Sequence, residues 1–135
     1  MTYELKPIGV AHTQFKNISE VPRCSKEFMY DGCIEIFPEY ADCIIGLERH
    51  KNIFAFAWMH QSDRSIKIVS PRIDKDRPPQ GVFATRSPVR PNPIGLTLLD
   101  LVRIDGLKLY VKGVDFLDGT PIIDIKKYDQ VLDTP

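Results

Sequence analysis

The chain has 135 residues, 43% of them apolar, and its eighteen basic and eighteen acidic residues give a formal net charge of zero. This length and composition indicate one domain, residues 1–135, with a modest hydrophobic core, and they exclude collagen-like and disordered chains. The longest apolar run, residues 53–59, is strand-sized and falls well short of the ~20 residues of a membrane-spanning helix. The first residues show no secretory signal, so we expect no membrane partner.

The cysteine pattern points to a reducing compartment. Cys24, Cys33 and Cys43 are odd in number and form no CxxC pair, which argues against a disulfide framework. We therefore expect a cytoplasmic protein. No cysteine or histidine pair has the spacing of a zinc site, so we expect no metal.

The charge is unevenly distributed along the chain. Residues 64–92 contain seven basic and two acidic side chains, a local charge of +5 against −5 for the remainder. Six of the eleven prolines fall within residues 71–93. Such a stiffened basic segment presents a local anion-binding surface, or it is a solvated loop; charge alone leaves both interpretations open.

Taken in chain order, the patterns predict mostly strands. We expect strands over residues 7–15, 32–37, 53–60, 65–69, 94–104, 107–111, 114–117 and 122–125, with a short edge strand over 81–85. Residues 16–31 are predicted as a loop and residues 40–47 as a short helix. The continuous apolar run at 53–60 indicates a central strand buried on both faces. A mainly β domain of six to seven short strands, closed as an antiparallel barrel or packed as a sandwich, fits these elements.

The segment GVFATRSPVRPNPIGLTLLD (residues 81–100) is the first candidate for a ligand site. Arg86 and Arg90 can grip a carboxylate or phosphate through paired hydrogen bonds. The prolines on either side of Asn92 restrict the loop and lower the entropy lost when it is held in one shape. A rigid connector with solvated arginines is the alternative.

The segment LDGTPIIDIKKY is the second candidate. It is expected to group Asp118, Asp124 and Tyr128 around a tight turn and to turn the Gly119 and Thr120 amides toward a ligand. These three side chains are also our candidates for a catalytic base or hydrogen-bond acceptor. A plain hairpin with an Asp cap is the alternative.

A third candidate, His60–Gln61, follows the apolar strand directly, where polar residues often line a site, although a structural histidine is the alternative. No GxGxxG, P-loop or GxSxG motif occurs, which argues against Rossmann, P-loop and α/β-hydrolase chemistry.

The runs GVFATRSPVRPNPIGLTLLDL and VKGVDFLDGTPIIDIKKY closely resemble the TsaA-like family, and IGVAHTQF, VPRC and FAWMHQ match in the same order. The resemblance covers nearly the whole chain. It implies a homodimeric antiparallel β-barrel that binds S-adenosylmethionine outside the Rossmann class. It further implies methylation of the exocyclic nitrogen of threonylcarbamoyladenosine, beside the anticodon of tRNA.

The resemblance also implies the cofactor contacts, with Cys24 standing where the family usually has Gln. They are Pro22, Arg23, Cys24, His60, Gln61, Arg86, Leu96, Leu117, Asp118, Gly119 and Thr120. We expect the tRNA backbone or the threonyl carboxylate to contact Arg72, Arg77, Arg90 and Asn92.

Two alternatives stay open. One is a non-catalytic or regulatory module that binds S-adenosylmethionine. The other is a methyltransferase for another RNA or a small molecule, because the C-terminal extension of longer bacterial relatives is absent from this sequence.

Overall fold

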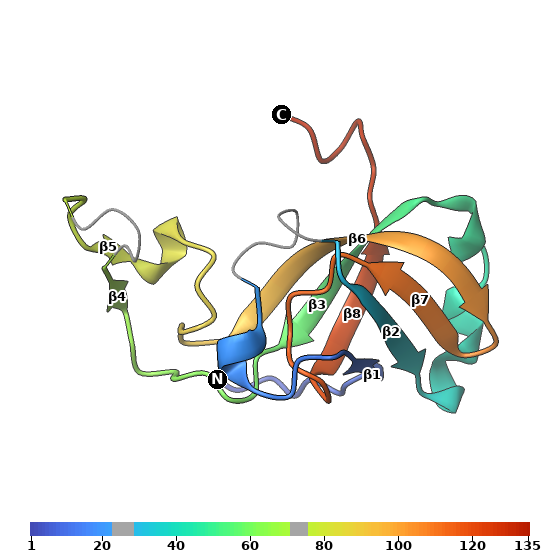
Figure 1. Cartoon of the computed structure of the whole chain (residues 1–135), viewed down its shortest axis with the longest axis horizontal. Helices are drawn as coiled ribbons and strands as arrows, with labels where there is room; N and C mark the ends of the chain where they lie inside the picture. The colour runs from blue at the N-terminus through green and yellow to red at the C-terminus, as the bar shows by residue number, and fades with distance from the viewer. Residues whose placement is uncertain (23–28, 71–75) are drawn as a thin grey trace.

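The computed structural model describes residues 1–22, 29–70 and 76–135, and its centre is a closed six-stranded antiparallel barrel (Figure 1). The barrel strands are β1 (Gly9–His12), β2 (Asp31–Ile36), β3 (Asn52–Trp58), β6 (Ile94–Asp105), β7 (Lys108–Lys112) and β8 (Pro121–Lys127). Two further strands, β4 (Ile68–Val69) and β5 (Gln80–Gly81), pair only with each other. The mainly β barrel predicted from the sequence is confirmed.

The strand order around the barrel is β1-β2-β7-β6-β3-β8, and β8 pairs back onto β1 through Val10 and Pro121. Every neighbouring pair is antiparallel. Closure leaves none of these six strands with an unpaired edge, which removes a usual route to aggregation.

Alternating side chains fill the barrel. Ile34, Ile53, Leu99, Leu109 and Ile122 are all fully buried inside it. Burying one such side chain stabilises a fold by roughly 1.5–3 kcal/mol relative to leaving it exposed. These residues anchor five different strands, so the interior is one shared core.

The strand expected to be buried on both faces is buried on one. In β3 every second residue faces the core, and Phe54, Phe56 and Trp58 between them are half-buried. The physical reason is that a barrel wall has one inner face, and the outer face here carries aromatic side chains that stay partly exposed. Because both faces of this strand carry apolar residues, the two-residue alternation of burial cannot be recognised from the residue types in this run.

Three predicted elements differ in detail. The helix expected over 40–47 is a pair of 3-10 helices, η2 (Pro38–Ile44) and η3 (Leu47–Arg49), separated at Gly46, whose φ is +90°. The edge strand expected over 81–85 is β5 followed by the 3-10 helix η4 (Val82–Ala84). The strand expected over 114–117 is a connection without strand pairing, because a left-handed Gly113 (φ +102°) turns the chain there. A further short 3-10 helix, η1 (Ile18–Glu20), lies in the predicted 16–31 loop.

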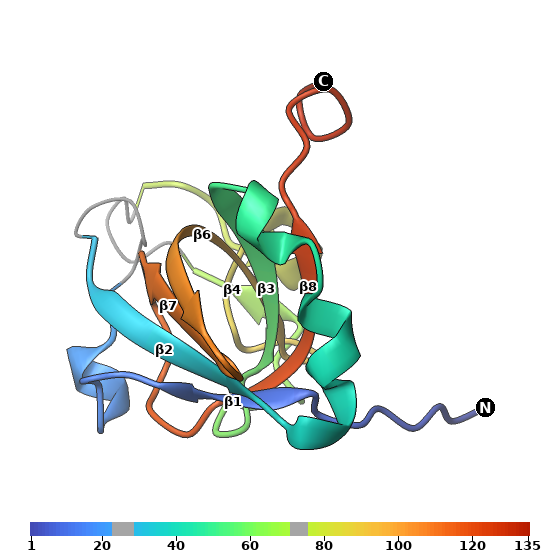
Figure 2. The same ribbon diagram turned by 90° about the vertical axis from the view of Figure 1, so that its right-hand side faces the viewer.

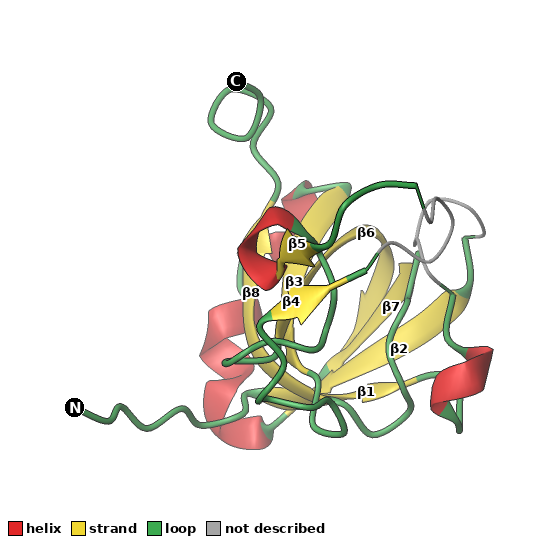
Figure 3. Ribbon diagram, turned by 90° about the vertical axis from the view of Figure 1, so that its left-hand side faces the viewer, coloured by secondary structure: helices red, strands yellow, loops and turns green. Residues whose placement is uncertain are grey.

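The β4–β5 hairpin stands apart from the barrel along the long axis of the molecule (Figure 1). The η2 and η3 helices lie at the opposite end, which faces the viewer in Figure 2. Figure 3 views the molecule from the hairpin end. No helix in the described ranges is long and apolar enough to cross a bilayer.

The antiparallel order assigns each connection to one end of the barrel. β1, β3 and β7 finish at the end where β2, β6 and β8 begin, as the pairs His12–Cys33, Trp58–Ile94 and Asp31–Lys112 show. The described parts of the connections 13–30, 59–93 and 113–120 therefore share one end, which we call the loop end. The 37–51 connection and the β6–β7 turn belong to the opposite end, where β1 begins and β8 finishes.

The close packing of the barrel wall can be tested at one glycine that lies against the backbone of a paired strand. A Cβ on Gly9 would lie 2.5 Å from the Glu35 carbonyl oxygen of the paired strand. We expect Gly9→Ala to lower the free energy of unfolding by about 1–3 kcal/mol, since the two strands must move apart. Thermal or urea unfolding measures this. Gly81→Ala is the matched control: its nearest atom is 3.9 Å away and its φ is −62°, so little change is expected. Equal stability of the two variants would contradict the packing.

Candidate functional site

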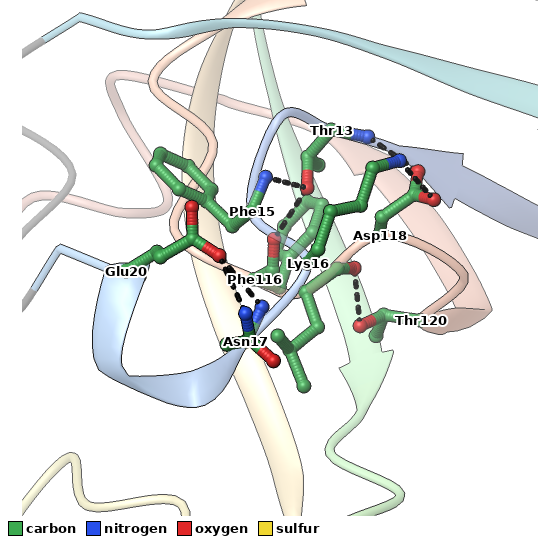
Figure 4. A network of polar contacts seen from close by, with 9 residues as sticks. Thr13, Phe15, Lys16, Asn17, Glu20, Phe116, Asp118 and Thr120 are labelled. Carbon is green, nitrogen blue, oxygen red and sulfur yellow. Dashed lines mark hydrogen bonds and ion pairs between the residues drawn. The ribbon is translucent and has the colours of Figure 1, made fainter.

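The 117–120 turn is bonded tightly to β1 and the residues that follow β1 (Figure 4). The Thr13 backbone N–H donates to Asp118 Oδ1 at 2.9 Å, and Lys16 Nζ lies 2.7 Å from Asp118 Oδ2. The hydrogen bond from Lys16, followed by that from Thr13, lowers the pKa of the Asp118 carboxyl group. Asp118 is therefore a charged anchor that holds two connections of the loop end together.

The two turn amides expected to face a ligand are used inside the protein. Gly119 N–H donates to the Ala11 carbonyl at 2.8 Å, and Thr120 N–H donates to the Leu117 carbonyl at 3.2 Å. The expectation for these amides is therefore wrong, because a tight turn beside a barrel strand satisfies its own donors. Gly119 has φ +80°, a left-handed conformation in which glycine avoids the strain of a side chain.

Buried hydroxyl groups complete this network. Thr13 Oγ1 donates to the Phe116 carbonyl at 3.0 Å and accepts the Phe15 N–H at 3.2 Å. Thr120 Oγ1 donates to the Leu117 carbonyl at 2.7 Å. These bonds, all visible in Figure 4, fix the course of the chain on both sides of Asp118.

His60 and Gln61 lie exposed in the turn that follows β3. The turn is closed by the Ser62 N–H donating to the Met59 carbonyl at 2.9 Å. The Met59 N–H in turn donates to the Pro93 carbonyl at 2.7 Å, which ties this turn to the start of β6. Both predicted residues thus stand at the loop end with their side chains open to solvent.

Arg86 connects the proline-rich loop, residues 86–93, to β6. Its Nη2 donates to the Leu96 carbonyl at 2.9 Å, so the two residues predicted from the same motif are in contact. The Leu96 side chain is 38% exposed on the outer face of β6. An arginine has five N–H donors, and the guanidinium keeps donors for a ligand.

Arg90 and Asn92 are partly engaged within the same loop. Arg90 Nη1 donates to the Thr85 and Ser87 carbonyls at 3.2 and 2.9 Å. Asn92 Oδ1 accepts from Arg64 Nη2 at 3.3 Å. Arg90 therefore folds the proline-rich loop onto itself.

Arg64 is a residue that the sequence reasoning missed. Its Nε donates to the Pro91 carbonyl at 2.8 Å, and its guanidinium carbon lies 5.3 Å from the centre of the Trp58 ring. A cation over an aromatic face is attracted by the ring electrons. The side chain clamps the end of β3 to the proline-rich loop.

Asp124 and Tyr128 do not gather around the turn as predicted. Asp124 is exposed in β8, opposite Phe56. Tyr128 follows the far end of β8, where its N–H donates to the Asn52 carbonyl and its ring lies 5.9 Å from that of Phe54. The reason is that β8 continues for seven residues and carries Tyr128 to the opposite end of the barrel.

Two of the remaining predicted residues lie in the described parts of the chain, and three do not. Pro22 is half-buried in the 13–30 connection, and Arg77 is exposed just before β5. Arg23, Cys24 and Arg72 lie outside the described residues.

Asp115 is the second residue that sequence reasoning missed. This half-buried carboxylate lies between the buried Val114 and Phe116, and its Oδ1 accepts from the Thr97 hydroxyl at 2.7 Å. Burial raises the pKa of Asp115, opposed by the Thr97 hydrogen bond and the charge of Arg86. The sequence signal for Asp115 is its position in the run VDF (residues 114–116), directly before the LDGT turn (residues 117–120).

An apolar hollow of about 500 Å³ lies at the opposite end, lined by residues that include Ile44, Ile45 and Leu107. It lacks the converging polar groups of a cofactor site. Among the described residues, no group of three or more His, Cys, Asp or Glu side chains is arranged to hold a metal ion.

Comparison with known proteins places the chain in a family. Residues 10–134 match the family model of the tRNA-methyltransferase O N-terminal domain. The chain belongs to this family. The match confirms the resemblance to TsaA-like proteins on which the site residues were assigned.

Similar proteins come from archaea and bacteria. A probable S-adenosyl-L-methionine-binding protein of Methanothermobacter thermautotrophicus is 42% identical over 99% of this chain and 96% of its own length. An S-adenosyl-L-methionine-binding protein of Archaeoglobus fulgidus is 41% identical over 96% of this chain and 91% of its own.

Crystal structures of TrmO share the fold. The enzyme from Pseudomonas aeruginosa superposes with a TM-score of 0.82 at 30% identity, over 100% of this chain and 60% of that chain. A second TrmO structure gives 0.81 at 32% identity over 61% of its length. The chain thus spans about three-fifths of the solved TrmO chains.

The Lys16–Asp118 bond predicts a pH-dependent loss of stability in Asp118→Asn. Because folding lowers the Asp118 pKa, its contribution is present above the unfolded value of about 3.9 and is lost as pH falls through the lower folded value. We expect the variant to be less stable by roughly 1 kcal/mol at pH 7 and to approach the wild type as acidification protonates the Asp118 carboxyl group. Urea unfolding across this range measures it.

Asp105→Asn is the matched control, because that exposed carboxylate lies 3.7 Å from Arg103 and such pairs contribute little. A stability difference for Asp118→Asn that is the same at every pH would contradict the role of its charge.

Proposed function

We propose that this protein is an S-adenosylmethionine-dependent methyltransferase that acts on the exocyclic nitrogen of threonylcarbamoyladenosine in tRNA. One observation carries the proposal. The described parts of the three connections in which the family resemblance implies cofactor contacts all lie at the loop end of one closed barrel. Segments that are distant in sequence are thereby available to a single ligand.

The residues at the loop end fit the chemistry of this cofactor. The guanidinium of Arg86 can donate hydrogen bonds to its carboxylate. The exposed side chains of His60 and Gln61 can form hydrogen bonds with the edges of its adenine. The partly exposed Leu96 offers apolar contact beside them. When bound, the cofactor supplies an electrophilic methyl group.

Asp118 acts in this proposal by holding the site together. Its bonds to Lys16 and Thr13 fix the 117–120 turn against the 13–30 connection. A positioned turn keeps the cofactor and the acceptor in line, which is where most of the acceleration of a direct displacement originates.

The basic side chains of the 59–93 connection support a tRNA substrate. Arg64, Arg77 and Arg86 are exposed in it, although the whole protein is neutral. A local cluster of this kind binds phosphate or the threonyl carboxylate without general attraction to nucleic acid. The structural likeness to TrmO supports the same substrate. Because tRNA is a cytoplasmic substrate, we place the protein in the cytoplasm.

A non-catalytic S-adenosylmethionine-binding module is the second candidate. It is favoured by the names of the archaeal relatives, which state binding alone. A methyltransferase acting on another RNA or on a small molecule would share the same cofactor site.

We further propose that the protein acts as a homodimer. Phe83 is 86% exposed and Ile68 is 66% exposed on the hairpin that stands apart from the barrel. An isolated two-stranded hairpin is marginally stable in water, so contact with a second copy would stabilise it. Sedimentation equilibrium is expected to give about twice the 15.4 kDa chain mass, and a monomer at micromolar concentration would contradict the dimer.

The function is tested by incubating the purified protein with labelled S-adenosylmethionine and tRNA that contains threonylcarbamoyladenosine. We expect mass spectrometry of the nucleosides to show one methyl group added to that base. Cofactor binding in calorimetry without methylation would favour the non-catalytic module. Absence of any cofactor binding would overturn the whole proposal.

Arg86→Ala is expected to weaken cofactor binding by about tenfold or more, because a charge-assisted hydrogen bond contributes roughly 1.5–3 kcal/mol. Calorimetry measures the dissociation constant. Arg49→Ala is the control, an exposed arginine in η3 at the opposite end. Unchanged affinity in Arg86→Ala would place the cofactor elsewhere.

A further inference from the structure

The carboxylate of Asp115 lies between two of the cofactor motifs and is half-buried. The Asp115 side chain, in the β7–β8 connection, is hydrogen-bonded to Thr97, which is 5% exposed and faces the barrel interior. A carboxylate has about four lone-pair positions. The 2.7 Å bond from Thr97 therefore orients the group and leaves capacity for a further donor.

The surroundings of Asp115 belong to two cofactor motifs. Thr97 follows Leu96, whose carbonyl accepts from Arg86. The positive charge of Arg86 is close enough to act on the Asp115 carboxylate. Three residues beyond Asp115 is Asp118, the anchor of the 117–120 turn.

The other candidate bases are bound by other groups of the protein or lie elsewhere on the barrel. Both Asp118 oxygens already accept hydrogen bonds, from Thr13 and Lys16. Asp124 is exposed in β8, and Tyr128 lies at the opposite end of the barrel. Within the described part of the chain, Asp115 is the half-buried carboxylate at the loop end that is held in a fixed orientation by a neutral hydroxyl group, whereas Asp118 is paired with a lysine.

Methylation of a urea-type nitrogen needs a proton acceptor. Such a nitrogen is a weak nucleophile while it keeps its proton, and a positioned base relieves this limit. The base must lie beside the methyl donor without forming a tight ion pair with a lysine.

We propose that Asp115 accepts the proton from the acceptor N–H during methyl transfer. The inference rests on the proposed function. In the step, the nitrogen forms a bond to the methyl carbon as the carbon–sulfur bond breaks, and the electrons of that bond remain on sulfur as a neutral thioether. The N–H proton passes to the Asp115 carboxylate, which later releases it to solvent.

The half-buried position of Asp115 supports this role. Burial raises its pKa toward that of the proton to be removed, which improves a base as long as it stays ionised at neutral pH. Arg86 limits the rise by favouring the charged form. The carboxylate accepts from the Thr97 hydroxyl and from its own backbone N–H, and its remaining lone pairs are available to the substrate.

The test is single-turnover methylation of threonylcarbamoyladenosine tRNA by Asp115→Asn, with S-adenosylmethionine binding measured by calorimetry. We expect the rate to fall about 100-fold or more with little change in cofactor affinity. Asp115→Glu should recover part of the rate. The wild-type rate should rise with pH through the Asp115 pKa and then level off, and the Asn variant should lack this rise.

Asp105→Asn, at the opposite end of the barrel, is the matched control and should keep the wild-type rate. Equal rates in the wild type and Asp115→Asn would overturn the role of Asp115 alone. A rate loss explained entirely by weaker cofactor binding would also overturn it, in favour of a structural role. A wild type that transfers no methyl group would overturn the proposed function, and this role with it.

Discussion

Closure of the antiparallel barrel is the constraint on which the rest of this structure depends. When Pro121 pairs with Val10, the sixth strand completes the ring, and the direction of every strand is fixed. Three connections must then lie at one end and the remaining connections at the other. The core side chains make this arrangement costly to change, because a shift of one residue would move each of them out of the interior.

A second level of order lies in the polar bonds between those connections. Asp118 joins the β7–β8 turn to the residues after β1, and Arg64 joins the end of β3 to the proline-rich loop. Arg86 links that loop to β6. The loop end is thus built from segments that are each tied to a barrel strand, and little ordering remains to be done when a ligand binds.

Much of the fold could be predicted from local pattern, and the failures have physical causes. The alternation in β2 and β7 and the Asp–Gly turn between β6 and β7 identify these elements directly. The one-sided burial of Phe54 and Phe56 depends on barrel closure, which no local window contains. Tyr128 and Asp118 are close in sequence but lie at opposite ends of the barrel, because the seven residues of β8 separate them.

The site was predictable to the extent that motifs mark it. His60, Arg86 and Asp118 lie at one end of the barrel, as their motifs imply, whereas Asp115 was missed because its burial and its bond to Thr97 arise from tertiary contact. The most direct test of the shared site is an amide NMR titration with S-adenosylmethionine. We predict the largest shifts at Arg86, Leu96 and the 117–120 turn. Largest shifts in η2, η3 or the β6–β7 turn would contradict it.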